Sequence, residues 1–361
     1  MRFLSTHVEL VLCRQGGLFL YMTAFMMLIL PLTIFFLEYI TGSLKAPSIS
    51  SGNLQPTPTK VKQILIYPIK SCRGFAVQKA KLLKTGLDLD RNWMFVAAAP
   101  LKFLTIRQIS EMTLIDTVIT AHDELEVSVR NEPSIALKIP AHPSEGWLKE
   151  NTKLIAHCEI WGEKVDGYVY SETLTAPFSD FLKKDIRLVY KGPTPRVLKG
   201  NASPPILGRS ESTKFADLMP VQVSNQKSID ELNYRLELMG EKPITVERFR
   251  PNIVIEGDEP WYEDVWKTIK VRDGSEETSV TMDVVARCAR CTVPNVDPNT
   301  AVKHEKEPWN TLMSYRRIDK GITFKPCFGM LCVPREEGEV AVGNQFQITE
   351  VTQQHEYMKG M

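Results

Sequence analysis

The sharpest chemical feature of this 361-residue sequence is the cysteine pair in Cys288-Ala289-Arg290-Cys291. A structural zinc site would need two further ligands, which Cys327 and Cys332 could supply. A redox dithiol usually lies at a helix N-terminus in a thioredoxin-like setting, and the sequence around the pair does not have that pattern. A single thiolate could instead bind a soft, high-valent metal, with Arg287 and Arg290 favouring its ionised form. Two buried cysteines at a strand end are the plain structural alternative.

Several basic residues stand beside predicted turns rather than along helical faces. They are Lys70 (next to Ser71), Arg91, Arg107 and Arg250. Arginine forks and backbone N–H groups are the usual receptors for a phosphate, so this set suits a pocket for an anionic ligand. A lone arginine near a strand end is more often a solvated or ion-paired surface residue. The pattern by itself therefore leaves both interpretations open.

The elements that would position these residues are mostly short strands. Two helices are predicted, a short one between Ala176 and Lys184 and an amphipathic one from Ser228 to Leu238. In the second, Ser228 is the expected N-cap and Glu231 completes a capping box. The predicted strands are residues 64–67 (ended by Pro68), 93–97, 114–119, 125–129, 186–190, 221–224, 253–256, 278–285 and 345–351. Because strands outnumber helices, the body is predicted to be α+β, with a β-barrel or strongly curved sheet in its second half.

The amino-terminal region predicts a membrane anchor. Residues 18–37 contain no Asp, Glu, Lys or Arg. As a helix they would span roughly 30 Å, about the hydrocarbon thickness of a bilayer. A cleaved signal peptide is the alternative, although its apolar region is normally shorter and a clear cleavage site is missing. Residues 41–60 are rich in Ser, Thr, Gly and Pro and are predicted to be a flexible linker.

Composition narrows the class of protein. The chain is 43% hydrophobic and 24% charged, which is typical of a folded globular protein. A formal net charge of +1 argues against nonspecific nucleic-acid binding. Seven cysteines cannot all pair within one chain, and their spread differs from that of a small secreted disulfide framework. A reducing compartment, with some thiols used as ligands, is the simpler expectation.

Five motifs in a fixed order make the sequence resemble the MOSC family with its N-terminal companion domain. Within that family it is most similar to the mitochondrial amidoxime-reducing components. The similarity runs from about residue 61 to 350. The motifs are YPIKSC (67–72), DRNWMF (90–95), TIRQ (105–108), FRPNIV (249–254) and RCARCTVPNVDPNT (287–300).

The resemblance implies a domain order and a set of site residues. The metal ligand and catalytic residue would be Cys291, and Ala289 would contact the cofactor only through its backbone, because relatives often have Ser there. The expected segments are a short flank (1–17), a transmembrane anchor (18–37), a linker (41–60), a mixed α/β MOSC_N-like domain (61–200) and a β-barrel MOSC domain (201–353). The expected cofactor-binding residues are Lys70, Ser71, Arg91, Arg250, Asn252, Ala289 and Arg290.

The resemblance also implies an activity. The cofactor would be molybdenum with a pyranopterin, and the reaction a two-electron reduction of amidoximes, hydroxylamines and N-oxides. The sequence has no flavin or haem motif, so electrons would come from cytochrome b5 and its NADH-dependent reductase. The outer mitochondrial membrane would be the favoured location and the endoplasmic reticulum the second, with a cytosolic catalytic body. Two alternatives stay open: a cofactor-binding or sulfur-carrier module without reductase activity, and a structural zinc protein at a membrane surface.

Overall fold

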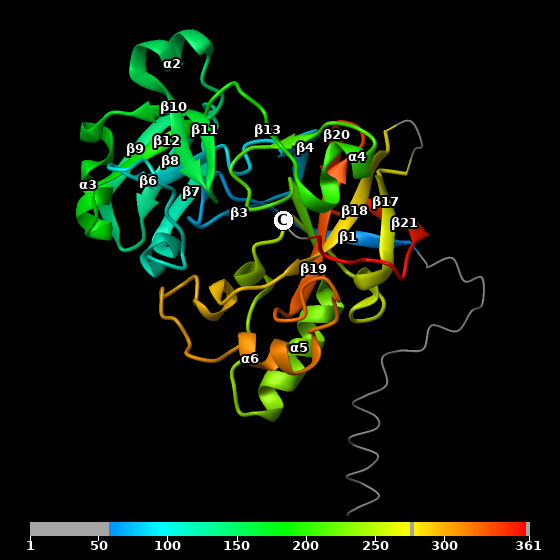
Figure 1. Cartoon of the computed structure of the whole chain (residues 1–361). Coiled ribbons are helices and arrows are strands. Elements are labelled where there is room, and N and C mark those ends of the chain that lie inside the picture. The colour runs from blue at the N-terminus through cyan, green and yellow to red at the C-terminus, as the bar shows by residue number, and fades with distance from the viewer. Residues whose placement is uncertain (1–57, 275–277, 359–361) are drawn as a thin grey trace, which may run out of the picture. The chain divides into compact units, whose positions relative to one another are not determined.

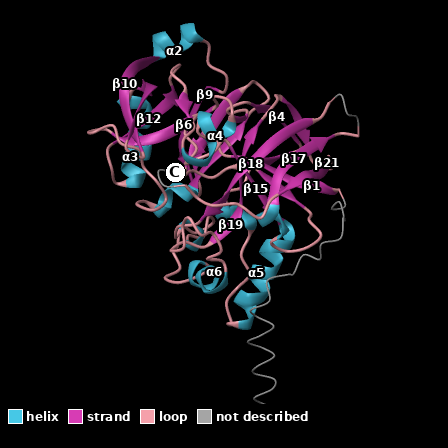
Figure 2. Cartoon of the chain, turned by 45° about the vertical axis from the view of Figure 1, so that its right-hand side comes forward, coloured by secondary structure: helices cyan, strands magenta, loops and turns pink. Residues whose placement is uncertain are grey.

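The computed structural model describes residues 58–274 and 278–358 (Figure 1). These residues form a mixed α+β body in which strands dominate, as the colouring by secondary structure in Figure 2 shows. The predicted anchor (18–37) lies outside the described residues, as does nearly all of the predicted linker (41–60). Within the described ranges, no helix is both long and apolar enough to cross a membrane.

A closed barrel of seven strands forms one part of the body. Around the ring the order is β16-β15-β19-β18-β17-β21-β1, and β16 pairs with β1 to close it. The predicted barrel is therefore present, but it takes one strand, β1, from the first half of the chain. The ring strands are β1 (Thr59–Ile66), β15 (Val221–Asn225), β16 (Ile253–Ile255), β17 (Trp266–Arg272), β18 (Val280–Ala289), β19 (Cys327–Pro334) and β21 (Gln345–Val351). Outside the ring, β3 (Phe75–Val77) pairs with β1 as an eighth strand.

Four smaller sheets accompany the barrel. The largest has five strands in the order β10-β11-β12-β6-β2, all from residues 69–191. It contains β2 (Ile69–Lys70), β6 (Trp93–Ala97), β10 (Thr152–Ile160), β11 (Glu163–Tyr170) and β12 (Ile186–Lys191). The others are β7 (Ile115–Ile119) with β8 (Glu124–Val129) and β9 (Glu132–Pro140); β4 (Lys79–Leu83) with β5 (Gly86–Leu87) and β20 (Gly338–Ala341); and β13 (Arg196–Val197) with β14 (Ser212–Thr213).

The helices are short and lie outside the sheets. The longest, α5 (Gln226–Leu238), packs against α6 (Trp309–Tyr315) below the barrel in Figure 1. On the five-stranded sheet, α3 (Glu172–Leu182) packs against β12 and matches the helix predicted near residues 176–184. The remaining α-helices of the described residues are α2 (Glu145–Asn151) and α4 (Pro204–Leu207).

The structure corrects the predicted start of α5. Its N-cap is Asn225, whose side chain accepts a hydrogen bond from the Lys227 N–H at 2.9 Å. Ser228 lies inside the helix, where its hydroxyl donates to the buried Glu263 carboxylate at 2.9 Å. Asn caps a helix as well as Ser does, and a buried carboxylate must have hydrogen-bond donors. The predicted capping box from Ser228 to Glu231 is therefore wrong.

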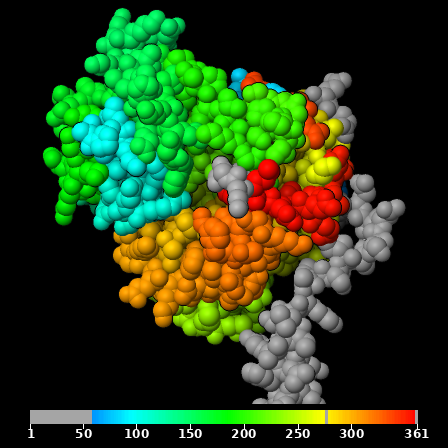
Figure 3. Space-filling model, in the orientation of Figure 1, coloured from blue at the N-terminus to red at the C-terminus, as the bar shows by residue number. Residues whose placement is uncertain are grey.

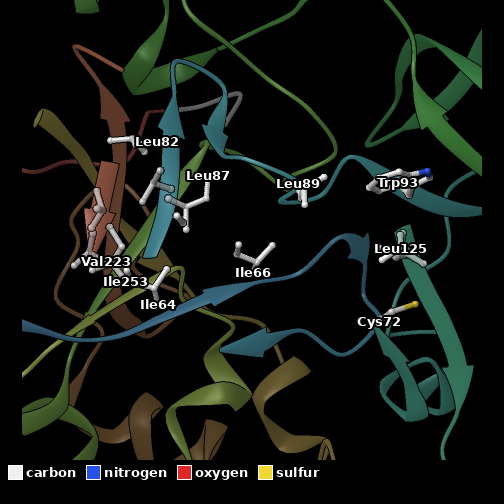
Figure 4. Close-up of a cluster of buried hydrophobic side chains, with 14 of the residues drawn as sticks. Ile64, Ile66, Cys72, Leu82, Leu87, Leu89, Trp93, Leu125, Val223 and Ile253 are labelled. Carbon is white, nitrogen blue, oxygen red and sulfur yellow. The ribbon is translucent and has the colours of Figure 1, made fainter. Parts of the chain in front are cut away.

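One hydrophobic core joins the barrel to the N-terminal sheets. It runs from Ile64 and Ile253 in the barrel, through Leu89, to Trp93 and Leu125 (Figure 4). All five side chains are almost completely buried. Burying a large apolar side chain contributes about 1.5–3 kcal/mol, so a shared core holds the two regions in a fixed arrangement. The segments that follow β1 and β18 and the one that precedes β16 are consequently fixed relative to one another.

Candidate functional site

The eight side chains assigned to the site from the sequence all line one cavity of about 470 Å³. They come from four segments that are far apart in the sequence: the end of β2, the turn before β6, the turn before β16 and the end of β18. A cavity of this size falls in the range of small-molecule and cofactor sites. The eight are Lys70, Ser71, Arg91, Arg250, Asn252, Ala289, Arg290 and Cys291.

Cys291 lies just beyond the end of β18, next to an arginine from the other half of the chain. Its Sγ is 3.2 Å from Nε of Arg107. The same guanidinium donates to Asp217 at 3.3 Å and lies 4.8 Å from the centre of the Trp161 ring. Burial opposes the charge of Arg107, but Asp217 and Cys291 outweigh it and raise its pKa. A permanent positive charge beside the sulfur is the setting typical of metal-binding and reactive thiolates.

A buried lysine and a half-exposed aspartate form the adjoining wall. Lys70 is 5% exposed at its side chain, forms an ion pair with Asp217 and donates to the Phe215 carbonyl at 2.9 Å. Burial lowers the pKa of Lys70 to about 8, although Asp217 partly offsets this. Desolvation opposes the ionisation of Asp217, but Lys70 and Arg107 together lower its pKa. Asp217 therefore stays ionised and links the lysine to the arginine beside Cys291.

Two arginines, both in contact with the Tyr67 ring, form the cationic end of the cavity. The Tyr67 ring lies 4.4 Å from the guanidinium carbon of Arg91 and 4.3 Å from that of Arg250, distances typical of cation–π contacts. Arg91 donates to Asp90 at 2.6 Å and to the Arg250 carbonyl at 3.1 Å. Nη2 of Arg250 is buried and has no hydrogen-bond partner among the described residues. Burial and then the charge of Arg91 lower the pKa of Arg250 to about 10. An anion would supply the missing acceptor and balance the charge of Arg250, since Asp90 already pairs with Arg91.

Backbone strain is concentrated around the cavity. Ser71, Arg91, Trp161 and Arg250 all have positive φ angles, of 70°, 51°, 51° and 56°. All four residues line the cavity, and all four carry side chains that disfavour this region of φ/ψ space. Such conformations cost about 1–3 kcal/mol apiece and cluster at functional sites. The surrounding packing thus imposes these turn geometries, which aim the side chains at the cavity.

Two of the predicted cofactor-binding side chains brace the walls in this structure. Asn252 accepts from the Gln222 N–H at 3.1 Å and donates to the Leu65 carbonyl at 3.3 Å. Arg290 donates to the Phe328 carbonyl at 2.7 and 2.9 Å and to the Phe249 carbonyl at 3.0 Å. These bonds tie the turns of the site to the barrel strands. Ala289 is the last residue of β18. Its side chain is a methyl group, so its backbone N–H and C=O are the polar groups that it can offer to the cavity.

The four cysteines that could form a zinc site have different surroundings. Cys288 and Cys291 line the cavity, whereas Cys327 and Cys332 are fully buried in β19. Cys332 belongs to the hydrophobic core that also contains Ile64 and Trp93. In residues 58–274 and 278–358, no group of three or more His, Cys, Asp or Glu side chains is arranged to hold a metal ion.

The sequence interpretation missed several cavity residues. Arg107 was named among the basic residues that suit an anion pocket, but it was not among the residues assigned to cofactor binding. Asp217 and Trp161 follow no local pattern, because only the fold brings them to Arg107 and to each other. Arg248 and Tyr357 also line the cavity, the latter from a segment beyond the last motif.

Comparisons with known proteins agree with this architecture. Residues 58–185 match the family described as the MOSC N-terminal beta barrel domain, and residues 210–347 match the MOSC domain. Mitochondrial amidoxime-reducing component 1 of Homo sapiens is 30% identical over 293 residues, covering 79% of this chain and 81% of that protein. The Mus musculus protein of the same name is also 30% identical and covers 79% of this chain and 80% of its own.

A plant protein is similar over the same part of the chain. The molybdenum cofactor sulfurase of Arabidopsis thaliana is 31% identical over 320 residues, which cover 80% of this chain. The chain matches only 37% of that longer protein. Together, the two matching domains and the relatives matched over most of their length show that this chain belongs to the MOSC family, with an N-terminal MOSC_N domain preceding the MOSC domain.

Proposed function

We propose that this chain binds a molybdenum–pyranopterin cofactor in the 470 Å³ cavity and reduces N-hydroxylated compounds. The observation that carries the proposal is that the Cys291 thiol and the cationic pair Arg91 and Arg250 line the same cavity. The relatives named amidoxime-reducing component and molybdenum cofactor sulfurase support a role connected with this cofactor. Amidoximes, hydroxylamines and N-oxides are the proposed substrates.

The residues of the cavity divide the task of binding between them. The Cys291 thiolate would bind the metal, since thiolates suit soft metals and Arg107 balances the charge. Arg91 and Arg250 would hold the terminal phosphate of the pyranopterin, because the partnerless N–H of Arg250 needs an acceptor. When bound, the cofactor supplies a metal that can exchange two electrons and take up an oxygen atom. The ion pair between Lys70 and Asp217 would keep the wall that adjoins Cys291 charged.

The proposed reaction balances with an external electron source. An amidoxime, two electrons and two protons give an amidine and one water, and the N–O bond is the bond that breaks. We propose cytochrome b5 and its NADH-dependent reductase as the source. A charged rim of the kind formed by Arg107, Lys199 and Lys325, all of which line the cavity, suits a brief contact with an acidic electron carrier.

A cofactor-binding or sulfur-carrier module is the second candidate function. The similarity to the plant sulfurase favours it specifically. Metal analysis of the purified chain, followed by an assay of benzamidoxime reduction, separates the two. About one molybdenum per chain and NADH-dependent reduction with the reconstituted electron chain are expected for the reductase. A chemical electron donor is the control that bypasses the partner proteins. Molybdenum without reduction by either donor would support the carrier, and zinc in its place would support a structural scaffold.

The anchor proposal makes a separate prediction. Deleting residues 1–55 should give a soluble protein that keeps its activity, because the folded body starts with β1 at Thr59. The measurement is the distribution of both proteins between membrane and soluble fractions, with amidoxime reduction assayed in each. A truncated protein that stays in the membrane fraction, or one that no longer folds, would contradict the prediction.

A further inference from the structure

A strap of residues 352–358 follows β21 and borders the cavity. In Figure 3 the C-terminal segment, in red, lies between green segments above and orange segments below. Tyr357 of this strap is one of the residues that line the cavity. The strap lies beyond residue 347, where the match to the MOSC domain ends. It is therefore a wall of the site that the domain match does not cover.

The far end of the strap is fixed by side chains of other segments. The Asn201 amide donates to the Glu356 carbonyl at 2.8 Å and accepts from the Met358 N–H at 2.9 Å. The Asp319 carboxylate accepts from the Tyr357 N–H at 2.8 Å. These three bonds hold the backbone on both sides of Tyr357 and so determine where its ring lies.

The near end is tied to a buried group of charges. Arg287 is buried and donates to the His355 carbonyl at 2.7 Å, while its guanidinium lies 3.5 Å from Asp319. The His355 ring nitrogen lies 2.5 Å from the Trp266 carbonyl. A Cβ atom placed on Gly321 would lie 1.9 Å from the Tyr357 carbonyl oxygen, so only glycine lets the strap approach this closely. The strap is thus a built part of the fold.

The cavity has an apolar side next to this strap. Leu198, Leu218, Met219 and Tyr357 all line it and belong to, or pack against, one hydrophobic cluster. Cys288, three residues before Cys291, packs against the same cluster. Burial, and then the neighbouring Cys288, raise the pKa of the Tyr357 phenol, so the ring is neutral at physiological pH. The cavity therefore has a cationic end at Arg91 and Arg250 and an apolar wall in contact with Cys288.

We propose that Tyr357 is a specificity-determining residue, whose ring forms the apolar wall on which the hydrocarbon part of a substrate packs. The proposal rests on the proposed reductase function and names its substrate class: N-hydroxylated compounds that carry an aromatic or other bulky apolar group. An anionic cofactor group is bound by the cationic end, which leaves the apolar wall for the substrate. A phenyl ring packed on tyrosine, leucine and methionine gains contacts that a methyl group cannot make.

The test compares two amidoximes with the same reactive group. Benzamidoxime carries a phenyl ring where acetamidoxime carries a methyl group. In the cofactor-loaded full chain, Tyr357→Ala should raise the KM for benzamidoxime about tenfold, the equivalent of losing one aromatic contact of about 1.4 kcal/mol. The KM for acetamidoxime and both kcat values should change less than about twofold. Tyr357→Phe keeps the ring and should behave like the wild type.

A second variant moves the strap without replacing any residue that lines the cavity. Gly321→Ala should displace Tyr357 and reproduce the loss of preference for benzamidoxime, while Gly146→Ala, at an open position on α2, is the matched control. An unchanged preference in Tyr357→Ala, or equal losses for both amidoximes, would overturn the proposal. If the wild type reduces neither compound, the reductase proposal fails by itself. Calorimetric measurement of benzamidoxime binding to the cofactor-loaded protein then tests whether Tyr357 forms part of the substrate site. An equal Kd for the wild type and Tyr357→Ala would refute that role.

Discussion

Cys291→Ala is expected to abolish N-reduction, whereas Cys288→Ala is expected to keep bound metal and most of the activity. The two thiols have different surroundings. The Cys291 sulfur is 3.2 Å from a cationic nitrogen of Arg107. The Cys288 sulfur packs against an apolar cluster, and its polar neighbour, Gln222 Oε1, is 4.0 Å away. Losing the first removes the proposed metal ligand. Losing the second costs only packing, roughly 1 kcal/mol of unfolding free energy.

The measurements for this pair are molybdenum per chain and the rate of amidoxime reduction. Thermal unfolding of the metal-free proteins provides the folding control, because both variants should melt within a few degrees of the wild type. Equal losses of metal in both variants would favour a site that uses the cysteines as a pair. One zinc ion per chain, lost in either variant, would also favour a paired-cysteine site over a single thiolate ligand.

Changing Arg91 and Arg250 together to Gln is expected to lower cofactor affinity by at least about a hundredfold. Each charge-assisted hydrogen bond contributes about 1.5–3 kcal/mol, and 1.4 kcal/mol corresponds to a factor of ten. The stability of the cofactor-free body should change little. Burial lowers the pKa of Arg250 to about 10, which means that its charge is disfavoured in the empty site. Gln relieves that cost and offsets the lost ion pair between Arg91 and Asp90.

The readouts are the cofactor content of the purified double variant and its unfolding midpoint without cofactor. A control double variant changes Arg187 and Arg335, which pair with carboxylates away from the cavity. The control should keep its cofactor. Full occupancy in the Arg91/Arg250 double variant would make both residues ordinary structural arginines and would move the phosphate site elsewhere.

Local sequence patterns predicted where the strands lie better than which strands pair with one another. Strands β6 and β21 begin and end at the predicted residues, because compact apolar or alternating runs define them. The end of β18 was placed too early, before the charged Arg287, which the fold buries among Asp264 and Asp319. The pairing of β1 with β16 could not be predicted, since it joins residues almost two hundred positions apart.

The site residues likewise divide into those that a local motif predicts and those that only the fold brings together. Residues in contiguous motifs, such as Lys70 and Arg250, were assigned to one site, and the structure does bring them to one cavity. Their roles stay predictions. Asp217 and Tyr357 lie in segments whose local sequence has no motif, so only the tertiary structure reveals that they face the same space. The N-cap of α5 was misplaced for a related reason, because the partner of Ser228 is a glutamate 35 residues away.

Barrel closure through β1 has a consequence for how the protein is made. β1 is the first strand of the body to leave the ribosome, but its barrel partners β16 and β21 start at residues 253 and 345. β3 can pair with the last residues of β1 early, but the backbone groups that face β16 and β21 stay unpaired until those strands emerge. An exposed strand edge of this kind is a template for aggregation. Pairings between distant residues also slow folding. The barrel therefore cannot close until its last strand, β21, has been synthesised, so its earliest strand waits for a ring partner through most of translation.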